Sequence, residues 1–103
     1  MMPADVLKKI VEKRDLTANE ARDFLVGVMD GTVSATMTAA ILTALRMKGE
    51  TVDEITGCAL VMRDKAYHIK STRQPVVDTC GTGGDKSGTF NISTCAAFVA
   101  AGA

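Results

Sequence analysis

A glycine-rich segment at residues 78–94, "DTCGTGGDKSGTFNIST", sets the strongest limit on what this chain can fold into. It holds four of the chain's nine glycines, and most of its other residues are Asp, Asn, Ser or Thr. The apolar residues before it follow Pro75 and predict a short buried strand of a parallel sheet at residues 76–78. The alanine-rich "STCAAFVAAGA" that ends the sequence predicts a closely packed helix. The segment is therefore expected to join a strand to the start of a helix.

This strand and this helix need more surrounding chain than residues 73–103 provide. One strand cannot form a sheet, and a helix that is apolar on every side has to be covered. We therefore expect residues 73–103 to be the first strand, loop and helix of an α/β domain whose remainder is missing from this chain. We also expect the two cysteines that flank the loop, Cys80 and Cys95, to be buried.

The preceding residues, 1–72, predict four helices with short connections, which together form a small helical bundle. Apolar residues recur at helical spacing in residues 4–14, after Thr17, after Ser34 and from Thr51 to about Tyr67. The composition then changes to the polar "KSTRQP", which places a domain boundary near residue 72. The predicted fold class is mainly α, with a helical domain at residues 1–72 followed by the truncated α/β domain.

Two of the predicted helix starts show the Thr-x-x-Glu pattern of a capping box, at Thr17 to Glu20 and at Thr51 to Glu54. In this motif the Thr hydroxyl accepts a hydrogen bond from the Glu backbone, and the Glu side chain accepts one from the Thr backbone. The fourth helix is then expected to turn one apolar stripe toward the core. That stripe consists of Ile55, Cys58, Ala59, Met62 and Ala66.

Composition excludes several classes of protein. Lys and Arg number 12, as do Asp and Glu, so the chain has no general attraction to nucleic acid or to an anionic membrane. The three cysteines are odd in number and lack CxxC spacing, which argues against a disulfide framework and a zinc site. No apolar run has the form of a signal peptide or the length of a membrane span. We therefore expect a cytoplasmic protein without a nucleic-acid or membrane partner.

The glycine-rich segment has the chemistry of an anion site. Glycines let backbone N–H groups approach a phosphate, and the first turn of the following helix adds N–H groups at the positive end of its dipole. Short polar donors stand in the same segment, at Thr82, Ser87, Thr89, Asn91, Ser93 and Thr94. Asp85 would repel a phosphate unless it holds a ribose hydroxyl or a cation, and magnesium prefers oxygen ligands of this kind.

Two familiar phosphate loops are excluded by their residues. The Walker pattern finds Gly83 and Gly88 at the right spacing, but Thr89 stands where the phosphate-binding lysine is required. The dinucleotide pattern GxGxxG finds Gly81 and Gly83, but Lys86 replaces the third glycine. Neither an ATPase of this type nor an NAD enzyme is supported.

Instead, "GTGGD" followed by "TFNIST" resembles the phosphoribosyl-pyrophosphate loop of the nucleoside phosphorylase-like (class III) phosphoribosyltransferase family, and within it the enzymes that act on anthranilate. The resemblance extends back through "SATMTAAILTALRMKGET" and covers the whole chain. It implies transfer of the phosphoribosyl group from phosphoribosyl pyrophosphate to the amine of anthranilate, in tryptophan biosynthesis.

The resemblance also implies roles for individual residues. The residues expected to bind phosphoribosyl pyrophosphate are Gly81, Thr82, Gly83, Gly84, Asp85, Thr89, Asn91, Ile92, Ser93 and Thr94. Gly81 is also expected at the edge of the anthranilate pocket, and the Ser93 hydroxyl is expected to reach Mg²⁺. The family's later Lys-His-Gly-Asn loop, its anthranilate-contacting arginine and its Asp-Glu metal pair do not occur here. The resemblance thus implies no catalytic residue in this chain, no activity of the chain alone, and a homodimer formed through the first and third helices.

Two alternatives stay open. Pyrimidine nucleoside phosphorylases share a helical domain and an α/β domain with a phosphate loop, although "GTGGD" with "FNIST" favours the transferase. The helical part could also serve as a homodimerisation module without activity of its own. A nucleic-acid-binding relative of the fold is disfavoured. The chain has no net positive charge to bind a phosphate backbone, and one tyrosine and three phenylalanines provide few aromatic rings on which bases could stack.

Overall fold

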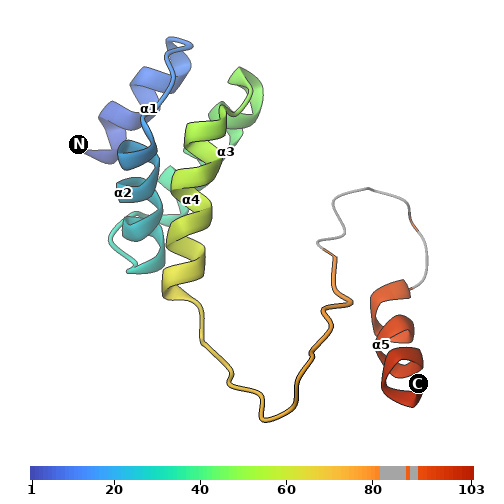
Figure 1. Cartoon of the computed structure of the whole chain (residues 1–103). Helices are drawn as coiled ribbons and strands as arrows, with labels where there is room; N and C mark the ends of the chain where they lie inside the picture. Colours follow the sequence, from blue (N-terminus) through green and yellow to red (C-terminus); the bar gives the residue numbers. More distant parts are fainter. Residues whose placement is uncertain (82–87, 89–90) are drawn as a thin grey trace. The chain divides into compact units, whose positions relative to one another are not determined.

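The computed structural model describes residues 1–81, 88 and 91–103. These residues form five α-helices and divide into two compact units, Met1–His68 and Ile69–Ala103 (Figure 1). The first, called the helical unit below, contains α1 (Pro3–Val11), α2 (Ala18–Met29), α3 (Ala35–Lys48) and α4 (Val52–Lys65). The second, called the loop unit, contains α5 (Ile92–Gly102). The prediction of a mainly α chain with four N-terminal helices is confirmed.

Local sequence signals determine where the helices begin and end. Both predicted capping boxes are present: Thr17 N–H donates to the Glu20 carboxylate at 2.8 Å, and Thr51 N–H donates to the Glu54 carboxylate at 2.8 Å. Such a cap contributes about 1 kcal/mol to helix stability. The first helix ends at Val11, before the end of the predicted range 4–14, because a turn with a left-handed Lys13 (φ 58°) follows.

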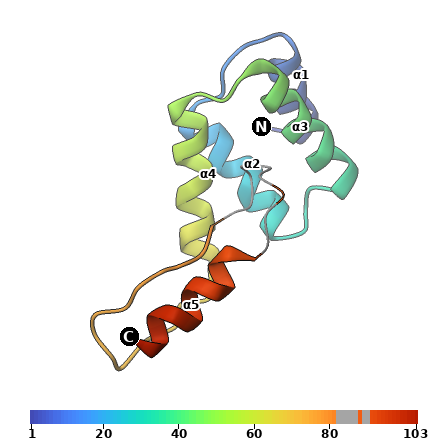
Figure 2. The same cartoon turned by 90° about the vertical axis from the view of Figure 1, so that its right-hand side faces the viewer.

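The core of the helical unit lies between two pairs of helices. Figures 1 and 2 show α2 beside α4, and α3 packs on α1. Ile10 and Ile41 are the most completely buried side chains of that second pair, at 1% and 0% exposure. The buried cluster consists of Val6, Ile10, Leu16, Ala21, Phe24, Ile41 and Leu45.

The predicted stripe of α4 is wrong except at Cys58, which is partly buried and packs against the core. The face of α4 that packs inward carries Glu54, Gly57 and Val61, whereas Ile55 and Met62 are more than half exposed. Gly57 explains the difference, because a Cβ at this position would collide with the backbone carbonyl oxygen of residue 18 in α2. The two helices therefore approach each other closely at the glycine, and this contact sets the direction in which α4 faces.

The loop unit buries little of its surface. The predicted strand at residues 76–78 is absent, because the described residues of this unit contain no second strand with which it could pair. No residue of α5 is fully buried, and Phe98 is 77% exposed. For the same reason the expected burial of Cys80 and Cys95 is wrong, since both are exposed free thiols. Of the helices in residues 1–81 and 91–103, none is both long and apolar enough to cross a bilayer.

Candidate functional site

The N-terminus of α5 forms one side of the candidate site. Asn91 is the N-cap residue, and its side-chain oxygen accepts a hydrogen bond from the Thr94 backbone N–H at 3.0 Å. Ile92 and Ser93 follow as the first two helical residues. Because the N–H groups of a first helical turn lack intrahelical partners and carry partial positive charge, this end of α5 favours an anion.

Residues 78–81 form the other side of the site. The Asp78 carboxylate accepts a hydrogen bond from the Cys80 N–H at 2.8 Å, so Asp78 shapes a local turn. The backbone N–H of Gly81 donates to Ser93 Oγ at 3.3 Å, and Thr79 Oγ1 donates to the Ser93 carbonyl oxygen at 3.4 Å. These contacts bring residues 79–81 to the first turn of α5, although Gly81 and Ser93 are 12 positions apart in the sequence.

The structure thus brings together five of the ten residues predicted to bind phosphoribosyl pyrophosphate. These are Gly81, Asn91, Ile92, Ser93 and Thr94. The other five, Thr82, Gly83, Gly84, Asp85 and Thr89, lie outside the described residues. A Cβ at Gly81 would meet no atom of the described residues within 4 Å. Sequence reasoning missed Thr79, although a hydroxyl two residues before the first loop glycine could have signalled it.

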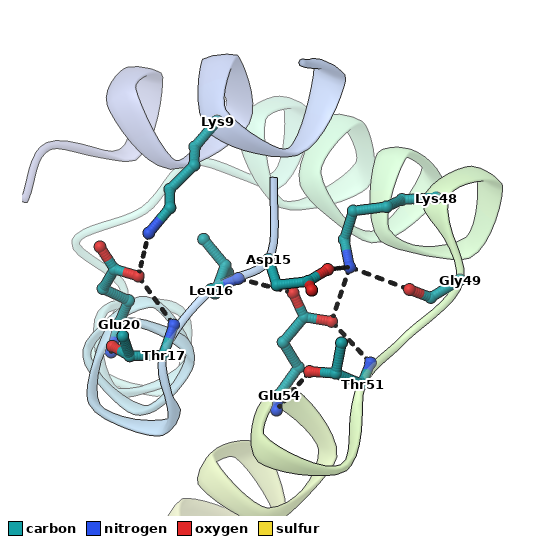
Figure 3. A network of polar contacts seen from close by, with 9 residues as sticks. All are labelled: Lys9, Asp15, Leu16, Thr17, Glu20, Lys48, Gly49, Thr51 and Glu54. Carbon is teal, nitrogen blue, oxygen red and sulfur yellow. Dashed lines mark hydrogen bonds and ion pairs between the residues drawn. The ribbon is translucent and has the colours of Figure 1, made fainter. Parts of the chain in front are cut away.

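A second polar cluster lies inside the helical unit, where the α1–α2 and α3–α4 connections meet (Figure 3). Lys48 Nζ donates to Asp15 Oδ1 at 2.8 Å and to Glu54 Oε2 at 3.0 Å. The other Glu54 oxygen accepts from the Leu16 N–H at 2.8 Å, and Oε2 also accepts from the Thr51 N–H. The side chains of Lys48 and Glu54 are only 5% and 2% exposed. The cluster is therefore a buried ion pair whose members are hydrogen-bonded to both connections.

The surroundings of Lys48 and Glu54 favour the charged form of each. Burial alone would raise the pKa of Glu54, but hydrogen bonds from two backbone N–H groups and the contact with Lys48 outweigh it and lower that pKa. Burial would lower the pKa of Lys48, but its bonds to Asp15 and Glu54 outweigh that effect and raise it. Both groups therefore stay charged around neutral pH, so this cluster suits a structural role better than proton transfer.

Glu20 and Cys58 also fit structural roles. A hydrogen bond from Lys9, supported by the Thr17 backbone, lowers the pKa of Glu20. Burial raises the pKa of the Cys58 thiol, whose Sγ lies 3.8 Å from the Ala21 carbonyl oxygen, so this thiol is not activated as a nucleophile. Among residues 1–81, 88 and 91–103, no group of three or more His, Cys, Asp or Glu side chains could hold a metal ion. The α5 N-terminus with residues 79–81 is therefore the strongest candidate site.

Comparisons with known proteins match the helical part and the C-terminal part of the chain to different domains. Residues 4–66 match the helical bundle domain of a glycosyl transferase family, and residues 73–103 match the a/b domain of a glycosyl transferase family. Two curated relatives, from Pelotomaculum thermopropionicum and Chloroflexus aurantiacus, are named anthranilate phosphoribosyltransferase. The first is 54% identical over 102 residues, 99% of this chain, and the second is 54% identical over 99 residues, 96% of this chain.

A third relative, from Thermotoga maritima, is named bifunctional protein TrpGD and is 55% identical over 97 residues, 94% of this chain. The chain spans 30% and 29% of the length of the first two relatives and 16% of the third.

Proposed function

The chain belongs to the glycosyl transferase family whose helical bundle and a/b domains its residues match, and we propose that it is part of an anthranilate phosphoribosyltransferase. The complete enzyme transfers the phosphoribosyl group of 5-phosphoribosyl 1-pyrophosphate to anthranilate. The products are N-(5-phosphoribosyl)anthranilate and pyrophosphate, in tryptophan biosynthesis. The identity of 54% with relatives of that name, over nearly the whole chain, supports this proposal.

The observation that carries the proposal is the contact between Gly81 and Ser93. It places a glycine backbone and the positive end of α5 side by side, in a sequence whose intervening residues are mostly glycines and short polar side chains. Backbone N–H groups and helix N-termini in this arrangement bind phosphates. In this proposal, the phosphates of phosphoribosyl pyrophosphate lie between Gly81 and the N-terminus of α5. Gly81 also lies at the edge of the anthranilate pocket.

The reaction is a displacement at the anomeric carbon of the ribose. The anthranilate nitrogen donates its electron pair to this carbon, the bond from the carbon to the pyrophosphate oxygen breaks, and pyrophosphate leaves with the electron pair of the broken bond. The nitrogen, which is positively charged once the new bond has formed, then releases a proton to water. The sugar carries positive character and the leaving group gains negative charge in the transition state. A cradle of backbone dipoles assists by holding the reactants in line and by stabilising the leaving group, and this part of the work falls to the chain described here.

Magnesium fits the donor set of this site in one specific way. Ser93 offers a hydroxyl oxygen that accepts one hydrogen bond from Gly81, and an oxygen of this kind has a second lone pair for a cation. Mg²⁺ in phosphate sites takes few protein ligands and completes its shell with water and substrate phosphates. We assign Ser93 as one such ligand. When bound, the ion supplies neutralisation of the pyrophosphate charge.

The proposal includes a homodimer formed through the helical unit. Helices α1 and α3 carry exposed apolar side chains, with Val11 at 66%, Leu42 at 51% and Met47 at 83% exposure. Such side chains are candidates for burial against a second copy. Light scattering over a dilution series tests this, because a dimer loses mass on dilution below its Kd and a monomer does not. The three free thiols of Cys58, Cys80 and Cys95 suit a reducing, cytoplasmic location.

The test is an assay of the full-length product of the gene that encodes this chain. We expect phosphoribosyl pyrophosphate and anthranilate to give pyrophosphate in the presence of Mg²⁺, and the 103-residue chain to give none. Asp85→Ala should lower kcat/KM at least about tenfold, as expected for a lost contact to a charged group. Asp53→Ala, an exposed aspartate of α4, is the matched control.

Two results would overturn the proposal. One is full activity of the Asp85→Ala enzyme, which would remove the loop from the site. The other is a full-length protein that cleaves a pyrimidine nucleoside with phosphate and has no activity with anthranilate, which would favour the phosphorylase alternative.

A further inference from the structure

Thr79 occupies an unusual place in the loop unit. Among the described residues of this unit, only Thr79, Ser93 and Ala96 are partly buried, and all others are exposed. Ser93 and Ala96 are three residues apart and therefore lie on the same face of α5. Within the described part of this unit, burial is thus confined to Thr79 and one face of the first turns of α5.

Two hydrogen bonds reach Ser93 from the opposite segment, and they hold different parts of the residue. Gly81 N–H donates to the Ser93 hydroxyl at 3.3 Å, which fixes the side chain. Thr79 Oγ1 donates to the Ser93 carbonyl oxygen at 3.4 Å, which fixes the backbone. Cys80, between them, directs its N–H to Asp78 instead. Alternate residues of the segment therefore clamp Ser93, and Thr79 is the member that acts through its side chain.

We propose that Thr79 is a positioning residue that fixes the backbone of Ser93, and thereby aims the Ser93 hydroxyl at the metal ion bound with phosphoribosyl pyrophosphate. This inference rests on the proposed function. It goes further because Thr79 itself touches neither the ligand nor the metal.

The physical reason lies in the demands of the ion. Mg²⁺ requires ligand oxygens at about 2.1 Å in near-octahedral geometry, so a small displacement of one protein ligand weakens binding. The bond from Gly81 holds only the hydroxyl of Ser93, whereas the bond from Thr79 ties the backbone of the first turn of α5 to residues 79–81. Threonine suits this task, because its branched side chain has few χ1 rotamers and holds its hydroxyl in place before the ligand arrives.

The test compares variants of the full-length gene product that differ in the hydroxyl alone. Thr79→Val removes the hydroxyl and keeps the shape, Thr79→Ala removes it without any risk of crowding, and Thr79→Ser retains it. Thr72→Val, at an exposed threonine of the same unit, is the matched control. The probe is Mn²⁺, whose binding in the presence of phosphoribosyl pyrophosphate is followed by electron paramagnetic resonance of the free ion. Steady-state kinetics over a range of Mg²⁺ concentrations accompany the titrations.

We expect the two variants without the hydroxyl to raise the apparent Kd of Mn²⁺ about fivefold, the factor that one hydrogen bond typically contributes. Thr79→Ser and Thr72→Val should stay within about twofold of wild type by the same reasoning. The Mg²⁺ concentration for half-maximal rate should shift by the same factor, with kcat recovered at saturating Mg²⁺.

Three results would overturn the inference. One is wild-type Mn²⁺ affinity in both hydroxyl-free variants. The second is an equal loss in Thr79→Ser. The third is a fall in kcat that excess Mg²⁺ does not restore, because a purely structural role would produce it. If the wild-type protein binds no phosphoribosyl pyrophosphate at all, the proposed function fails together with this inference, and the wild-type titration reports that separately.

Discussion

The two units of this chain use their polar residues in different ways. In the helical unit, charged groups are turned inward and paired, as the buried contact between Lys48 and Glu54 shows. In the loop unit, short polar side chains and backbone N–H groups gather at one helix terminus, and none of residues 69–81, 88 and 91–103 is fully buried. A core that satisfies its own polar groups is stable by itself, whereas a terminus with spare donors is suited to receive a ligand. Stability and binding should therefore respond to different substitutions.

The largest effect on stability is expected from Glu54→Ala. This change leaves the buried Lys48 with one carboxylate fewer and leaves the N–H groups of Leu16 and Thr51 without their acceptor. We expect the free energy of unfolding of the helical unit to fall by about 3 kcal/mol, measured by urea denaturation followed by circular dichroism. Glu50→Ala, at an exposed position just before α4, is the control and should change it by less than about 0.5 kcal/mol. Equal losses in the two variants would contradict the buried network.

A glycine pair tests the difference in packing between the units. Gly57→Ala places a methyl group against the backbone of α2, and we expect it to destabilise the helical unit by about 2 kcal/mol. Gly102→Ala places a methyl group where no atom of the described chain lies within 4 Å, and we expect a change within about 0.5 kcal/mol. Thermal melts of both variants measure the contrast. If Gly57→Ala melted like wild type, α2 and α4 would not approach as closely as described.

Acid should weaken the helical unit through two carboxylates. The pKa values of Glu20 and Glu54 are lower in the folded chain than the ordinary value of 4.5, so the unfolded chain binds more protons near that pH. Their stabilising contribution is complete above about pH 6 and is lost as the pH falls below 4.5 through the lowered values.

The loss should be smaller than that of Glu54→Ala, because protonation leaves the side chain in place. Urea denaturation between pH 3 and pH 7 measures it, and Glu20→Gln should flatten the dependence. A stability that did not change over this range would contradict the lowered values.

The smallest effect concerns the loop unit. Asn91→Ala removes the N-cap bond to Thr94 and should destabilise α5 locally by about 1 kcal/mol. Amide hydrogen exchange of α5 measures this, while the melt of the helical unit should stay unchanged. Asn91→Ser, which retains a capping oxygen, should lose less. Equal exchange rates in all three proteins would show that the cap is absent in solution.

Much of the helical unit could be predicted from the sequence, because its signals are local. The Thr17 and Thr51 boxes require only residues three positions away, and both helices begin where those patterns stand. The inward face of α4 could not be predicted from its apolar stripe. Glu54 is buried because Leu16, 38 positions away, donates to it, and no local pattern shows that. Gly57 was the available signal, since a glycine inside a helix usually marks a close approach.

The candidate site shows the same limit. The glycines and the polar residues of the loop predicted an anion site. The helix predicted to follow the loop is present and begins after Asn91. Ser93 was identified through a family resemblance. Its contacts with Thr79 and Gly81 depend on how the chain returns on itself, which spacing along the sequence does not specify.

One measurement tests the central claim most directly. Phosphoribosyl pyrophosphate with Mg²⁺ is titrated calorimetrically into the full-length gene product, beside its Asp85→Ala variant and the 103-residue chain. We predict saturable binding to the full-length protein, weaker binding to Asp85→Ala, and loss of binding in the chain alone. A full-length protein that releases no heat with this ligand, while it remains folded, would contradict the assignment of the loop as a phosphoribosyl-pyrophosphate site.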